Sequence, residues 1–209
     1  AHSMGGAIAI LALEPYPEMF EAAILSAPMC GMQTGKYPRI VAKLLAGSCC
    51  LTGKRKCFAR LAGQRSFSET PQFEGSSCLS RERYDYMFQK RLLDEHYRTY
   101  GGSYGWVLAG LRASRKLMRK ENLAKIKTPV LLFAAGHDHM VDNGAIKRFA
   151  EETERTKLFF MPDSRHEIFN ADERTRTKYY DEIFRFIKEE EVKDYENENE
   201  QTRKILGTV

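Results

Sequence analysis

Three short, mainly apolar runs with little polar alternation predict buried strands. They cover residues 22–27 (AAILSA), 129–135 (PVLLFAA) and 157–161 (KLFFM). A strand of a parallel sheet is covered on both faces, so its sequence is apolar throughout and not only at every second position. The runs therefore predict three strands of a parallel sheet that has helices on both sides.

Helical periodicity fills the segments around these runs. It predicts helices over residues 3–13 and 143–154, and a last helix that begins at a capping box formed by Asn170 and Glu173. Strands and helices thus alternate along the chain. This order is typical of the α/β class with a mostly parallel sheet.

Residues 30–125 interrupt the alternation with a mostly helical block. Helices are predicted over residues 37–51, from an N-cap at Ser80 through Tyr97, and over residues 106–120. No strand pattern is found in this block. We therefore interpret it as an insertion between two parts of one α/β core.

The pattern divides the chain into four parts. Residues 1–29 form the start of the core, 30–125 the helical insertion, 126–190 the rest of the core and 191–209 a charged tail. The tail is low in apolar residues, which predicts a frayed or disordered segment. A chain of 209 residues is long enough for one domain with a sizeable buried core.

Composition limits the cellular setting. No apolar run approaches the roughly 18 residues that span a bilayer, so no transmembrane helix is predicted. The five cysteines are odd in number and include no C-x-x-C pair, which favours a reducing, cytoplasmic compartment. The chain begins at Ala1 inside a motif, and we expect the true N-terminus, with any targeting segment, to lie upstream.

Charge is distributed unevenly along the chain. Residues 22–68 contain no Asp or Glu, whereas the final tail is strongly acidic. The basic residues of the acid-free stretch are Lys36, Arg39, Lys43, Lys54, Arg55, Lys56, Arg60 and Arg65. Apolar residues lie between them, which suits peripheral contact with an anionic membrane face, although a solvated basic surface is an equally simple interpretation. No recognition motif accompanies the charge, so nucleic-acid binding is not expected.

The first six residues, AHSMGG, resemble a nucleophile elbow of the G-x-S-x-G type, with Ala1 in place of the first glycine. In such an elbow the serine occupies a strained strand-to-helix turn, and a bulky flanking side chain would collide with neighbouring backbone. Ser3 would be the nucleophile, and the backbone N–H of Met4 would help to stabilise an oxyanion at the start of the following helix. Taken alone, the hexapeptide could also be a glycine-rich turn.

Two further residues follow the later strands. Asp138 comes directly after the run 129–135, and His166 comes shortly after the run 157–161. A carboxylate that accepts the Nδ1–H of a histidine orients it as a general base for serine. The chain order of Ser3, Asp138 and His166 is that of α/β-hydrolases. Asp142 competes with Asp138, but it stands where a helix cap is needed.

Other site types fit the sequence less well. The spacing from Gly47 to Lys54 is one residue too long for a phosphate-binding loop, and Arg55 stands where Ser or Thr is required. His137 and His139 could bind zinc, but no third ligand follows at a characteristic spacing. We therefore expect neither a metal nor an organic cofactor.

These motifs resemble those of the bacterial lysophospholipases and the related monoacylglycerol lipases. The resemblance is carried by AHSMGGAIAI with the following AAILSAPMCGM, by the sequence GGSYGWV at residues 101–107, by DHMVDN at residues 138–143, and by HEI at residues 166–168. It extends over nearly the whole chain, to about residue 190. It implies the α/β-hydrolase fold, with residues 30–125 as a helical cap over an acyl pocket.

The same resemblance implies a function and its residues. Ser3 would be the nucleophile, Asp138 the orienting acid and His166 the base for hydrolysis of a fatty acyl ester in a lysophospholipid or monoacylglycerol. A carboxylesterase or peptidase on the same triad is one alternative. A truncated, inactive hydrolase that binds lipid or a partner is another.

One part of the family pattern is absent from the 209 residues. The family has a preceding half-sheet and an H-G-x-G-like loop that supplies a second oxyanion donor, and neither is found here. Loss of one such donor costs roughly 10²–10³ in rate in other hydrolases. We expect these 209 residues alone to be poorly stable and nearly inactive.

Overall fold

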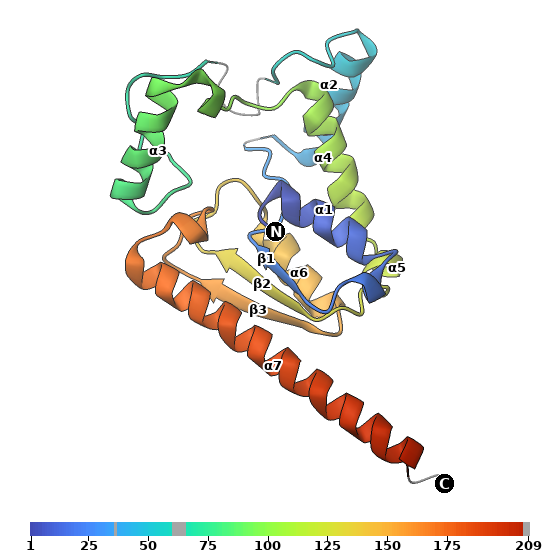
Figure 1. Cartoon of the computed structure of the whole chain (residues 1–209). Helices are drawn as coiled ribbons and strands as arrows, with labels where there is room; N and C mark the ends of the chain where they lie inside the picture. Colours follow the sequence, from blue (N-terminus) through green and yellow to red (C-terminus); the bar gives the residue numbers. More distant parts are fainter. Residues whose placement is uncertain (36, 60–65, 207–209) are drawn as a thin grey trace.

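A parallel sheet of three strands lies at the centre of the protein (Figure 1). The computed structural model describes residues 1–35, 37–59 and 66–206. The strands are β1 (Ala23–Ser26), β2 (Val130–Ala135) and β3 (Thr156–Met161), and they lie in the order β1-β2-β3. All three coincide with the apolar runs, and both pairings are parallel, so the predicted α/β architecture is confirmed.

The central strand β2 explains why its sequence is apolar without interruption. All six of its residues are buried, and they alternate between two hydrophobic cores. Leu132 belongs to the core between the sheet and helices α1, α4 and α6, whereas Phe133 belongs to the core beneath α7. A strand with a core on each side has no face that could carry polar residues.

Helices cover both faces of the sheet (Figure 1). On one side lie α1 (Met4–Leu13), α6 (Asn143–Glu152), the short α5 (Lys120–Leu123) and the lower part of α4 (Tyr104–Leu117). On the other side α7 (Glu173–Leu206) runs along the sheet. The remaining short elements are the 3₁₀ turns η1 (Pro17–Met19), η2 (Glu95–Tyr97) and η3 (Ile168–Asn170).

The first three residues extend the sheet beyond β1. His2 forms a parallel bridge with Ser26, whose N–H donates to the carbonyl oxygen of Ala1 at 2.9 Å. The Ser3 N–H donates in turn to the Ser26 carbonyl at 3.1 Å. This pairing places Ser3 at the carboxyl end of the sheet, where functional groups gather in α/β folds.

The block predicted as an insertion contains α2 (Arg39–Leu51), α3 (Arg81–Leu93) and α4, and it rises above the carboxyl ends of the strands (Figure 1). The small residues Ala42 and Ala46 of α2 are buried, while the large Ile40 and Leu44 are about two-thirds exposed. The lower end of α4 shares one hydrophobic core with α1. We propose that residues 30–125 act as a cap that is continuous with the core at this point.

Two cap helices differ from their predicted limits. The helix expected through Tyr97 ends at Leu93, because Asp94 is extended and its side chain accepts a hydrogen bond from the His96 N–H, which starts η2. The helix expected from Trp106 begins two residues earlier, at Tyr104. Ser103 caps it by accepting a hydrogen bond from the Trp106 N–H.

The predictions for the last helix were wrong at both ends. Asp172, not Asn170, accepts a hydrogen bond from the Thr175 N–H at 3.0 Å and caps α7. The helix then continues to Leu206 through the predicted disordered tail. Glu and Lys are good helix formers, and pairs such as Glu190 with Lys193 add support one turn apart. Residues 207–209 lie outside the described part of the chain.

The other expectations from composition concern cysteines and membrane spans. The five cysteines are free thiols in the structure. None of the helices in the described part of the chain is both long enough and apolar enough to cross a bilayer.

A close backbone approach next to the strand ends gives a testable prediction. A Cβ on Gly136 would lie 2.0 Å from the carbonyl oxygen of Pro162, which no side-chain adjustment relieves. We expect Gly136→Ala to lower the free energy of unfolding by about 1–3 kcal/mol. Gly47→Ala, in the middle of α2 with open space around its Cβ, should instead raise it by up to about 1 kcal/mol. Urea unfolding of both variants compares them, and equal effects would contradict the prediction.

Candidate active site

Ser3 lies at a strained turn between the sheet and α1. Its backbone has φ 52° and ψ −122°, a conformation that costs of order 1–3 kcal/mol for a residue with a side chain. The turn is held by the Ser3 N–H bond to Ser26 and by the Met29 N–H, which donates to the Ser3 carbonyl at 2.9 Å. Ser3 occupies the N-cap position of α1, yet its hydroxyl makes no capping bond. The hydroxyl is therefore left to face another partner.

Only one of the two glycines after Met4 is required by the space around it. A Cβ on Gly6 would lie 2.5 Å from the Cβ of Pro28, so a side chain there would push α1 away from the loop after β1. A Cβ on Gly5 would have nothing within 4 Å. The expectation that both flanks of the elbow are crowded is wrong for Gly5.

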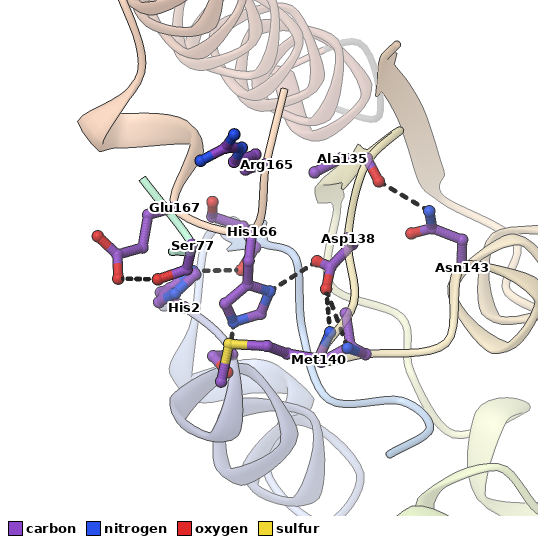
Figure 2. Close-up of polar contacts among 12 residues, drawn as sticks. His2, Ser77, Ala135, Asp138, Met140, Asn143, Arg165, His166 and Glu167 are labelled. Carbon is purple, nitrogen blue, oxygen red and sulfur yellow. Dashed lines mark hydrogen bonds and ion pairs between the residues drawn. The ribbon is translucent and has the colours of Figure 1, made fainter. Parts of the chain in front are cut away.

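His166 joins Ser3 and Asp138 into one hydrogen-bonded chain. Figure 2 shows its contact with Asp138. Its Nε2 lies 2.8 Å from the Ser3 Oγ, and its Nδ1 lies 2.6 Å from the Asp138 Oδ2. The side chains of His166 and Asp138 are buried. With the proton on Nδ1, the ring donates to the carboxylate and accepts from the hydroxyl, which is the arrangement of a serine nucleophile and its base. The structure thus brings all three predicted residues together.

The Asp138 carboxylate is held in its ionised form. Its Oδ1 accepts hydrogen bonds from the N–H groups of Met140 and Val141, at 2.8 and 3.0 Å (Figure 2). Burial alone raises the pKa of Asp138, but the hydrogen bond and positive charge of His166, together with those two N–H groups, outweigh burial. The pKa of Asp138 is therefore lowered overall, and the group carries a negative charge at neutral pH.

The competing carboxylate, Asp142, has a different role. Its Oδ1 accepts a hydrogen bond from the Gly144 N–H at 2.9 Å and caps α6, as its position predicted. Its other oxygen forms an ion pair with Arg39 of α2. Both oxygens are thus engaged away from His166, and Asp138 alone of the two carboxylates orients the imidazole.

The N–H of Met4 is placed to receive negative charge. Met4 is the first residue of α1, so its N–H has no acceptor within the helix, and no residue of the described ranges accepts a hydrogen bond from it. The positive end of the helix adds to this field. Above the elbow, the indole Nε1 of Trp106 lies 3.1 Å from the Met4 sulfur, so the cap contacts the elbow directly.

Three other histidines lie in different places. His96 is on the surface with Asp94. His137 and His139 line an open cavity of about 570 Å³ between the cap and the loop after β2. Among the described residues, no three His, Cys, Asp or Glu side chains are grouped so that they could hold a metal ion.

Comparison with known proteins places this geometry in a family. A family profile described as "Serine aminopeptidase, S33" matches residues 1–173. The chain belongs to this family of α/β-hydrolases. Its curated relatives include lysophospholipase L2 of Escherichia coli, which is 29% identical over 151 residues, covering 72% of this chain and 43% of the relative. The probable lysophospholipase L2 of Haemophilus influenzae is 23% identical over 190 residues, covering 90% of this chain and 58% of that protein. The chain therefore spans about half the length of these relatives.

Solved structures show the same fold. The monoacylglycerol lipase of Paleococcus ferrophilus superimposes with a TM-score of 0.64 at 19% identity, over 90% of this chain and 66% of that one. A soluble variant of the monoglyceride lipase of Saccharomyces cerevisiae superimposes with a TM-score of 0.66 at 18% identity, over 90% of this chain and 63% of that one. A carboxyl esterase of Bacillus coagulans superimposes with a TM-score of 0.65 at 17% identity, over 90% of this chain and 63% of that one. At these identities the likeness concerns the fold of the hydrolase.

His2 is a site residue that the sequence interpretation missed. Its ring is half-buried, with its centroid 4.6 Å from that of His166 and 5.0 Å from that of Phe169. Its Nδ1 lies 2.9 Å from the carbonyl oxygen of Ser26. The sequence feature that could have identified His2 is its position directly before Ser3. There the pairing with Ser26 places its ring beside that of His166.

Burial of His2 predicts a pH dependence of stability. Burial first, and then the charge of His166, lower the pKa of His2 below its ordinary value of 6.5. As pH falls below that value the unfolded chain binds a proton at His2 that the folded chain resists, so stability decreases. We expect the free energy of unfolding to fall between about pH 7.5 and 5.5, and His2→Phe to fall less steeply. Urea unfolding at several pH values measures both slopes, and parallel slopes would contradict this role of His2.

Proposed function

We propose that the protein is a lipolytic serine hydrolase that cleaves the fatty acyl ester of a lysophospholipid or a monoacylglycerol. The observation that carries the proposal is the continuous hydrogen-bonded path from the Ser3 hydroxyl through His166 to Asp138. The substrate class rests on the similarity to lysophospholipase L2 and on the fold shared with monoacylglycerol lipases. It is proposed for the whole protein, of which these residues are the part described.

The proposed reaction has two halves. In the first, His166 Nε2 takes the Ser3 proton as Oγ attacks the ester carbonyl, and the Met4 N–H stabilises the oxyanion. The imidazolium then gives this proton to the departing glycerol oxygen, which leaves an acyl-enzyme on Ser3. In the second, His166 deprotonates a water molecule that attacks the acyl carbonyl, and Ser3 recovers its proton as the fatty acid leaves. Asp138 stays ionised throughout and holds the ring orientation.

Two other functions use parts of the same structure. A carboxylesterase or a peptidase would need the same three residues, since a fold and a triad do not specify the substrate. An inactive hydrolase that binds lipid or a partner would keep the cap but would not activate Ser3. Reactivity of Ser3 and the choice of substrate separate these possibilities from the lipolytic one.

We also propose that α2 makes peripheral contact with an anionic membrane surface. Leu51 is 90% exposed, and Ile40 and Leu44 are also exposed, so the large apolar side chains of this helix face outward. Lys54 and Lys56 follow directly and are exposed. Apolar groups flanked by basic groups, without a nearby acidic residue in the sequence, match an anionic lipid leaflet.

The basic set proposed from the sequence is reduced by the structure. Arg39 is paired with Asp142, which neutralises part of its charge. Lys36, Arg60 and Arg65 lie outside the described residues. Among the described residues, the membrane proposal rests on Lys43 and on the group at residues 54–56.

The reactivity of Ser3 is the first prediction for this function. The whole protein should react with a fluorophosphonate probe, and Ser3→Ala should abolish the reaction, because only an activated serine is modified. Asp138→Asn should slow labelling by roughly 10³–10⁴, since the ring would lose its orienting charge. The matched variant Asp142→Asn, in the same loop, should label at nearly the wild-type rate. A wild-type protein that is not labelled would rule out the enzyme and leave the inactive alternative.

Turnover of a substrate panel is the second prediction. Lysophosphatidylcholine and monoacylglycerol should be hydrolysed with a kcat/KM at least about 10-fold above that for short p-nitrophenyl esters, and aminoacyl amides should be the poorest substrates. Specificity is read from the ratio of kcat/KM values, because that ratio compares transition states. Preference for the short esters would favour a carboxylesterase, and preference for the amides a peptidase.

Binding to vesicles tests the membrane contact. The protein should sediment with vesicles that contain phosphatidylserine and less with neutral ones, and Lys54→Gln with Lys56→Gln should weaken this binding roughly 10-fold or more, at about 1 kcal/mol per charge. The control removes two exposed lysines from α7, across the sheet from α2, as Lys178→Gln with Lys188→Gln. Equal loss in both double variants, or equal binding to neutral vesicles, would overturn the proposal.

A further inference from the structure

The two residues that flank His166 in sequence both contact one segment of the cap, residues 73–80. Arg165 and Glu167 lie on either side of His166, and Ser77 of the cap segment lies beside Glu167 (Figure 2). This segment contains neither a helix nor a strand and leads directly into α3. The loop that carries the base is therefore attached to the cap as well as to the sheet.

Glu167 is joined to Ser77 through both backbone and side chain. The Glu167 N–H donates to the Ser77 carbonyl at 3.0 Å, and the Ser77 hydroxyl donates to the Glu167 Oε1 at 2.5 Å. The second carboxylate oxygen accepts from the Asn170 Nδ2 at 2.8 Å. Hydrogen bonds to an ionised acceptor are the stronger kind, so this pair resists separation of the loop from the cap.

Arg165 attaches the other side of the loop. Its Nη1 donates to the carbonyl oxygens of Phe73 at 2.8 Å and Cys78 at 3.1 Å, and it approaches that of Ser76 at 3.4 Å. Its guanidinium lies over the Phe73 ring, 5.1 Å from the centroid. The ion pair with Glu74 is long, at 3.8 Å, and that carboxylate is almost fully exposed, so it adds little. Arg165 therefore attaches the loop to the cap segment mainly through hydrogen bonds from its guanidinium to backbone carbonyl oxygens of that segment.

The core holds this loop on both sides of His166, before it by a backbone hydrogen bond and beyond it by Ile168, which is fully buried against β2 and α7. The Ser164 carbonyl accepts a hydrogen bond from the His137 N–H at 2.9 Å, which anchors the loop shortly before His166. Directly beyond His166, the backbone bond made by the Glu167 N–H goes to the cap residue Ser77. The cap contact at Glu167 thus lies between His166 and the buried Ile168, and it adds an attachment immediately beside the imidazole.

We propose that Arg165 and Glu167 are positioning residues, which align His166 with Ser3 by attaching its loop to residues 73–80 of the cap. The inference rests on the proposed function of Ser3 and His166. It makes exact alignment of the base depend on a seated cap. When residues 73–80 move away, the loop keeps its core contacts at Ser164 and Ile168 but loses the attachments directly beside His166. A displacement of about 1 Å at a catalytic group can cost roughly 100-fold in rate.

Rates of fluorophosphonate labelling in the whole protein test this attachment. Ser77→Ala, Glu167→Ala and Arg165→Ala should each lower the maximal labelling rate about 10-fold to 100-fold, while the probe concentration at half-maximal rate changes less than about 3-fold. Ser77→Ala combined with Glu167→Ala should be no slower than the slower single variant, because both remove the same contact. Glu167→Gln keeps an acceptor for Ser77 and should stay within about 3-fold of wild type.

Matched controls separate positioning from general loss of stability. Ser68→Ala makes the same substitution earlier in the cap, where the hydroxyl donates to the Thr70 carbonyl and accepts from the Thr70 N–H. This variant should label at the wild-type rate. Thermal unfolding identifies any variant that is not folded at the assay temperature. Glu167→Gln then replaces such a variant, and its labelling rate should equal that of Ser68→Ala.

Each outcome has a distinct meaning. Variants that label as fast as wild type, or effects of Ser77→Ala and Glu167→Ala that multiply in the double variant, would overturn the inference and leave the proposed function intact. Slower labelling by Glu167→Gln to the level of Glu167→Ala would also overturn it, because charge and not the contact would then matter. A wild-type protein that does not label would overturn the proposed function, and this inference with it.

Discussion

The backbone of Ser3 is the constraint on which the rest of the site depends. A positive φ at a residue with a side chain persists only when its surroundings fix it, and here the pairing with β1 and the bond from Met29 do so. The close contact of Gly6 with Pro28 lets α1 begin immediately afterwards. The hydroxyl is consequently turned away from the helix end that it would otherwise cap and toward His166.

The parts of the fold that follow from local pattern were predicted well. β2 lies between two cores, and a continuous apolar run in the sequence predicts this burial. The strands β2 and β3 then fix where the loops at their ends begin. The carboxyl ends of parallel strands share one edge of the sheet. Chain order was therefore enough to expect that Ser3, Asp138 and His166 would meet, although 163 positions separate the first from the last.

The features that were missed depend on partners far away in sequence. Nothing local shows that Arg39 pairs with Asp142, or that Arg165 reaches carbonyl groups about 90 residues earlier. The outward direction of Leu44 follows from the packing of small residues of α2 against α4, which periodicity alone does not determine. The extent of α7 was missed because its last third is low in apolar residues, whereas the helix propensity of its Glu and Lys residues favours continuation of the helix.

The contact between Trp106 and Met4 gives the protein a built-in optical reporter. Trp106 is the single tryptophan of these 209 residues. It belongs to the cap, and its indole nitrogen contacts the thioether of Met4, which follows Ser3. Indole emission depends on its immediate surroundings, so separation of the cap from the elbow would alter the intrinsic fluorescence. Cap motion could thus be followed in real time without a dye, with the tryptophan signal of these 209 residues arising from one position beside Ser3.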